Sequence, residues 1–112
     1  MELKKIDERC KIDLTTGVSH ETTTYVIGDY EVNRYVNKQD GETIYDGVEV
    51  AGGYKERFLP MITFSGSYPG MVREFSIVAE EYGELEVDEV EILIRKYKRA
   101  VEVVKVLTET FC

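Results

Sequence analysis

The chain has 112 residues, of which 43% are apolar, and this size and composition suit a single domain with one hydrophobic core. It carries 22 acidic and 14 basic residues, for a formal charge of −8. Such a surface repels nucleic-acid phosphates, so direct binding of DNA or RNA is not expected, whereas a protein partner with a basic surface would be attracted. Acidity that serves only solubility is the alternative explanation.

Two cysteines, Cys10 and Cys112, stand near opposite ends of the chain, without the close spacing of a metal site. We predict reduced thiols, with a single disulfide as the alternative. The first residues lack the apolar core of a signal peptide, and no window approaches the ~20 apolar residues of a membrane span. These features favour a cytoplasmic protein that has no contact with membranes.

Residues 1–64 are expected to form mainly β-structure. Between Ile6 and Leu14 apolar residues alternate with charged ones, which predicts a strand with one buried face. The runs 22–27 and 30–36 are rich in β-branched and aromatic residues and flank Gly28-Asp29. This pattern is typical of a β-hairpin with a type II′ turn.

A second tight turn is predicted at Asp40-Gly41, before a strand over residues 42–50. Gly47 within that strand indicates a bulge or a close backbone approach. The next apolar run contains Pro60, which places it at a sheet edge or moves the start of the strand to Met61.

The last third of the chain is expected to be helical. Apolar residues at three- and four-residue steps predict a short helix over 70–83, and a long helix over 87–111 follows, with Asp88 as its N-cap. The apolar stripe of the long helix comprises Val90, Leu93, Ile94, Tyr97, Val101, Val104, Leu107 and Phe111. The predicted fold is therefore α+β, in a single domain over 1–112. An antiparallel meander of three to five strands is followed by a short helix and a long C-terminal helix packed on one face of the sheet.

No motif in the chain indicates catalysis. The one histidine, His20, lies in a polar turn, and no serine or cysteine stands in a G-x-S-x-G pattern. Phosphate-binding glycine loops and calcium-loop spacings are also missing from the sequence. We therefore expect a non-enzymatic protein without a cofactor or a metal ligand.

An acidic run is the strongest candidate for a binding surface. No basic residue interrupts the acids between positions 80 and 91, and such an array can approximate the charge spacing of a phosphate backbone. The alternative is that these acids only complement the dipole of the following helix. Tyrosines on an exposed sheet face would add contact area. The partner-binding candidates are Glu80, Glu81, Glu84, Glu86, Asp88, Glu89, Tyr25 and Tyr35.

In composition the chain resembles phage- and plasmid-encoded inhibitors, including anti-restriction and anti-CRISPR proteins, which are also small, acidic and without catalytic residues. The resemblance implies an inhibitor that blocks or mimics nucleic acid on a basic, nucleic-acid-handling protein. The alternative function is a structural or assembly subunit. In that case the valine-rich helix would join copies, most simply as a homodimer, through Val103 and Val106.

Overall fold

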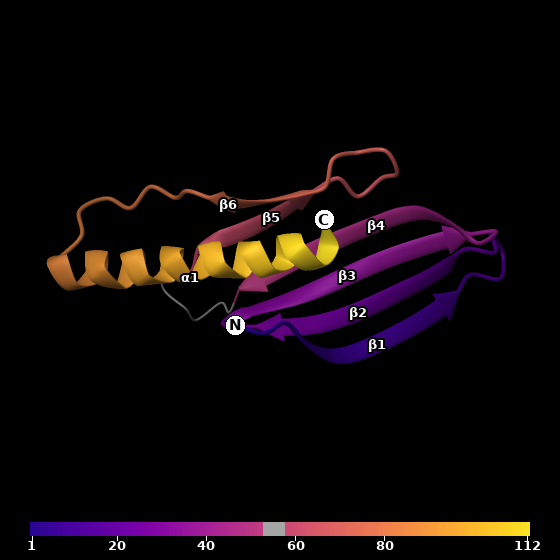
Figure 1. Ribbon diagram of the computed structural model, residues 1–112, viewed down its shortest axis with the longest axis horizontal. Coiled ribbons are helices and arrows are strands. Elements are labelled where there is room, and N and C mark those ends of the chain that lie inside the picture. The colour runs from indigo at the N-terminus through magenta and orange to yellow at the C-terminus, as the bar shows by residue number, and fades with distance from the viewer. Residues whose placement is uncertain (53–57) are drawn as a thin grey trace.

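The computed structural model describes residues 1–52 and 58–112 of the chain. Four strands form an antiparallel sheet in the order β1-β2-β3-β4, and a second sheet pairs β5 with β6. A long C-terminal helix, α1, runs along one face of the larger sheet (Figure 1). The predicted α+β arrangement is thereby confirmed. The elements are β1 (Lys4–Ile12), β2 (Ser19–Ile27), β3 (Tyr30–Gln39), β4 (Glu42–Gly52), β5 (Met61–Ser65), β6 (Glu74–Val78) and α1 (Val87–Phe111).

Both predicted hairpin turns are present. Ile27 pairs with Tyr30 across Gly28-Asp29, and the φ angle is positive at Gly28 (55°) but not at Asp29, as a type II′ turn requires. At Asp40-Gly41 both φ angles are positive (52° and 80°), as in a type I′ turn. These two turns fix the register of β2, β3 and β4.

Two further predictions concern the middle of the chain. A Cβ atom on Gly47 would lie 2.5 Å from the Oη of Tyr45, so the group that approaches this glycine is a side-chain ring and not the predicted backbone, and the register shift between β3 and β4 lies at Asn37/Lys38. Strand β5 begins at Met61, as predicted, after the buried Pro60. The hydroxyl of Tyr30 donates a 2.6 Å hydrogen bond to the carbonyl of Pro60, which holds the start of β5 against the larger sheet.

The core lies between α1, one end of the larger sheet and the β5–β6 hairpin. On α1 the buried positions Ala100, Val103, Leu107 and Phe111 follow one another at steps of three and four residues. Each large apolar side chain that is fully buried here contributes about 1.5–3 kcal/mol relative to an exposed one. The buried cluster comprises Ile27, Tyr30, Val32, Val48, Ile62, Phe75, Ala100, Val103, Leu107 and Phe111.

The expectation of a buried face on the first strand is wrong. All nine residues of β1 are exposed, including Ile6 and Ile12, and β1 contributes no residue to the buried cluster. The strand is the outer edge of the sheet, beyond the part that α1 covers (Figure 1). Its charged residues discourage pairing of this edge with another strand.

The predicted short helix over 70–83 is also wrong, because residues Glu74–Val78 form strand β6. Phe75 is buried and Ile77 half-buried, so the side chains alternate as in a strand and face the core through the pairing with β5. Met71 and Val72, which completed the helical spacing, are 54% and 81% exposed. Non-local pairing with β5 therefore prevails over a local helical pattern.

The molecule is elongated. It measures 56 × 27 × 24 Å, with a radius of gyration of 16.6 Å, whereas a compact chain of this length has about 13 Å. Its accessible surface of 7800 Å² exceeds the roughly 6300 Å² of a typical folded monomer of this mass. The N-terminal half of α1 extends beyond the sheet at one end, and the sheet extends beyond the C-terminus of α1 at the other (Figure 1). No helix among the described residues has the length and apolar character needed to cross a membrane.

Candidate functional site

The acidic segment, defined as residues 80–91, connects β6 to α1 and includes the first turn of the helix. It contains seven of the 22 acidic residues and none of the 14 basic ones, so it accounts for seven of the eight excess negative charges. The segment lies at one end of the long axis, where the connection meets the projecting N-terminus of α1 (Figure 1). The net charge of the protein is thus concentrated at one pole.

Aromatic residues hold the start of the acidic segment in place. The backbone N–H of Glu80 donates to the Oη of Tyr97 on α1 (3.4 Å), and the hydroxyl of Tyr82 donates to Glu80 Oε2 (3.2 Å). The Tyr82 ring packs edge-on against Phe58, with the ring centroids 5.1 Å apart. Burial and the contact with Glu80 raise the pKa of Tyr82 to about 12, so this hydroxyl stays protonated and continues to donate.

Some of the acids serve the helix itself. Glu86 is the N-cap of α1, and its backbone N–H donates to Glu89 Oε1 (3.2 Å) in a capping box. The predicted N-cap at Asp88 was therefore two residues too late, and Asp88 instead stands in the first turn, where its charge complements the helix dipole.

Three acids have no such role. Glu80, Glu81 and Glu84 precede the helix and are exposed. Among the described residues no lysine or arginine forms an ion pair with any of them. Their charge therefore exceeds what capping of the helix requires.

The two candidate tyrosines lie on opposite faces of the sheet, so the expectation that both stand on the exposed face is wrong for Tyr25. Tyr25 pairs with Val32 on the face covered by α1, and its ring contacts Phe111 with centroids 5.6 Å apart. Tyr35 pairs with Thr22 on the other face and is half-buried. Across the two-residue turn, odd-numbered residues of β2 pair with even-numbered residues of β3. Odd-numbered residues of the two strands therefore lie on opposite faces of the sheet.

The proposed oligomer contacts also require correction. Val103 is 1% exposed and belongs to the core, so its side chain is not available to a second copy. Val106 is half-buried and packs against the same core. The apolar positions of α1 that do reach solvent are others, chiefly Val87, Ile94 and Val101.

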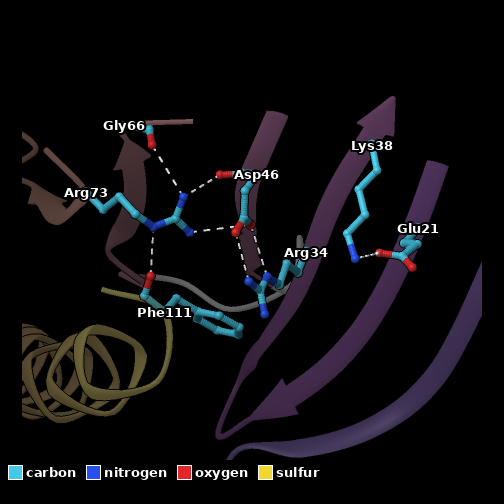
Figure 2. A network of polar contacts seen from close by, with 7 residues as sticks. All are labelled: Glu21, Arg34, Lys38, Asp46, Gly66, Arg73 and Phe111. Atoms are coloured by element: carbon cyan, nitrogen blue, oxygen red, sulfur yellow. Dashed lines mark hydrogen bonds and ion pairs between the residues drawn. The ribbon is translucent and has the colours of Figure 1, made fainter. Parts of the chain in front are cut away.

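Sequence reasoning missed a polar network at the C-terminus of α1 (Figure 2). Asp46 on β4 accepts a bidentate pair from Arg34 on β3, at 3.0 and 2.8 Å. Arg73 donates to the carbonyl of Asp46 (2.6 Å) and to the carbonyl of Phe111 (2.8 Å). Its guanidinium also lies 3.5 Å from the Asp46 carboxylate. The network therefore joins the larger sheet, the segment before β6 and the end of the helix.

The chemistry of this network is that of a structural clamp. Hydrogen bonds from Arg34 lower the pKa of Asp46 below its ordinary value, so the carboxylate stays ionised between two cations. The positive charge of Arg73 also complements the negative end of the helix dipole, where the last turn has no basic residue of its own. One feature of the sequence indicates that Asp46 takes part in such a network. Asp46 has the same strand parity as Val48 and Val50, and an acid on a buried face needs a partner.

Elsewhere the polar groups are dispersed. His20 lies 2.9 Å from Asn37 Oδ1 through its Nδ1, in an exposed position on β2. Within residues 1–52 and 58–112 no three histidine, cysteine or acidic side chains gather as metal ligands would. Cys10 and Cys112 are both free and exposed.

The fold and the acidic segment define an elongated α+β protein with one strongly negative pole. Comparison of the chain with protein-family models, with curated proteins and with solved structures finds no match.

Proposed function

We propose that the protein is a non-enzymatic inhibitor that places its acidic segment on a basic surface of a nucleic-acid-handling protein. The observation that supports this proposal is the concentration of seven of the eight excess negative charges in residues 80–91, at one pole of an elongated molecule. A charge distribution that served only solubility would have no reason to be confined to one end.

The geometry of the connection suits imitation of a phosphate backbone. Between β6 and α1 the chain runs as an extended trace beside the helix (Figure 1). An extended chain advances about 3.3–3.6 Å per residue, close to the ~3.4 Å of duplex axis per phosphate of one DNA strand. Carboxylates from Glu80, Glu81 and Glu84 could then take phosphate positions and displace the counterions of a basic groove.

The test is capture of the partner from a lysate, followed by titration of the purified pair with salt and with duplex DNA as a competitor. The double variant Glu81→Lys/Glu84→Lys should weaken binding by a factor of about ten or more, because two attractive contacts become repulsive. Glu86 and Glu89 are left unchanged in this variant, since they cap α1.

A matched control variant makes the same change in net charge at positions outside the acidic segment. Glu42 and Glu109 are exposed and lie outside the acidic segment, so Glu42→Lys/Glu109→Lys carries the same overall charge as the test variant. The control should bind almost as the wild type does. Binding that ignores salt, duplex DNA and the Glu81/Glu84 reversal would contradict the mimic mechanism.

A further inference from the structure

Helix α1 presents an apolar stripe to solvent. Val87, Val90, Ile94 and Val101 are 77%, 38%, 49% and 43% exposed, and they lie outside the buried positions of the helix, which are Ala100, Val103, Leu107 and Phe111. Their spacings of three, four and seven residues are those of a coiled-coil seam. Single exposed apolar residues are ordinary on a monomer, but a row of them along one helix face indicates an interface. The half-buried Tyr97 and Val104 continue the same heptad positions, although Val104 also packs partly against the protein's own core.

We infer that a second copy of the chain covers this stripe, with the two α1 helices antiparallel. In that arrangement Ile94 meets the partner's Tyr97, Val101 meets the partner's Val90, and Val87 meets the partner's Val104. In each of these contacts both residues are largely apolar, and the two-fold symmetry of the dimer makes every contact occur twice. The stripe is therefore self-complementary, as an isologous interface must be.

Charges beside the stripe select the antiparallel orientation. Glu91, Lys98 and Lys105 are exposed and stand seven residues apart along one flank of the seam. In the antiparallel pair Glu91 falls between the partner's Lys98 and the partner's Lys105, and this contact occurs twice. A parallel pair would instead set the two acidic segments side by side, each with seven negative charges.

The surface area of the chain is consistent with a missing partner. Its accessible surface exceeds that of a typical monomer of this mass by about 1500 Å², and a standard interface buries about 800 Å² per partner. The N-terminal half of α1, which carries most of the stripe, projects beyond the sheet, where a second helix can reach it (Figure 1).

The first test is sedimentation equilibrium of the intact chain over a wide concentration range. We expect a monomer–dimer equilibrium, and Val101→Lys should weaken it by a factor of about ten or more, because a charge replaces an apolar seam residue. The matched control is Val72→Lys, at an 81% exposed position away from the helix, which should leave the dimer unchanged. A wild type that stays monomeric throughout, or a dimer indifferent to Val101→Lys, would overturn the inference.

A second test fixes the orientation. In a Cys10→Ser/Cys112→Ser background, chains with Val90→Cys are mixed with chains with Val101→Cys and gently oxidised. The antiparallel pair predicts cross-linked heterodimers and little cross-linking of either chain alone. Efficient cross-linking of Val90→Cys with itself would overturn the antiparallel arrangement. The acidic residues Glu81 and Glu84 are untouched, so this result is independent of binding to a basic partner.

Discussion

At the scale of single residues, Asp46 connects segments that are far apart in the sequence. Its carboxylate receives Arg34 and lies beside Arg73, while its carbonyl accepts a hydrogen bond from Arg73. Arg73 in turn holds the carbonyl of Phe111 at the end of α1. The tertiary position of the helix C-terminus therefore depends on one acidic side chain of β4.

We expect Asp46→Ala to lower the free energy of unfolding by about 2 kcal/mol, because two partly buried cations lose their anionic partner. The pKa of Asp46 is lowered in the folded state, chiefly by the hydrogen bonds from Arg34. Its stabilising contribution is thus present above the unfolded pKa of about 4 and is lost as the pH falls through the lower, folded pKa.

Urea unfolding of both proteins measures this prediction. The difference in unfolding free energy between wild type and Asp46→Ala should be largest near neutral pH and shrink in strong acid. Asp7→Ala is the control, since the Asp7–Arg9 ion pair is exposed and contributes little. A difference that persists unchanged in strong acid would show that the carboxylate charge is not the cause.

Two glycines give a second prediction at this scale. Gly66 has a φ angle of 99°, and a Cβ atom there would collide with the backbone carbonyl of Val72, whereas Gly83 has open space around it and no positive φ. We expect Gly66→Ala to cost about 1–3 kcal/mol of stability and Gly83→Ala to be tolerated. Thermal melts followed by circular dichroism would compare them, and equal melting temperatures would contradict the strained loop.

At the scale of elements, the buried face of α1 differs from the face that the sequence predicts. The predicted stripe contained Val101, but the structure buries Val103 and leaves Val101 43% exposed. The buried face of the helix is therefore rotated relative to the predicted stripe, and it includes the fully buried Ala100, which the predicted stripe left out. The sequence pattern gives most weight to large apolar residues, so the centre of the predicted stripe lies to one side of the face that the structure buries.

We expect Val103→Ala to lower the unfolding free energy by about 2 kcal/mol, because it leaves a cavity in the core. Val101→Ala, two residues away on the same helix, should change it by less than about 0.5 kcal/mol when measured on the monomer at low concentration. Chemical denaturation of both variants is the measurement. Equal losses would place the buried face where the sequence alone put it.

At the scale of the whole molecule, shape and charge are unevenly distributed along one axis. The acidic segment occupies one pole, while the exposed edge strand β1 runs along the side of the sheet opposite β4 (Figure 1). An antiparallel dimer through α1 would set the two acidic segments at opposite ends of the paired stretch. The proposed dimer and the proposed binding to a basic partner are therefore compatible, and a dimer would offer two acidic sites.

Local chemistry in the sequence determined much of this protein. Gly28-Asp29 and Asp40-Gly41 fix their hairpins because few residue pairs allow the backbone angles that these turns need. The bounds 87–111 of the long helix and the position of the acidic segment also follow from residues adjacent in the chain. Each of these features depends on residues within a few positions of one another, so the sequence pattern is enough to predict it.

Tertiary structure alone decided the features that depend on distant partners. Residues 74–78 are a strand because β5 lies beside them, and Tyr25 faces the core because α1 covers that side of β2. The Arg34–Asp46–Arg73 clamp needs three segments to meet, which no local spacing encodes. The free energy of burial belongs to contacts between elements, so the faces of strands and helices are settled only when those elements pack.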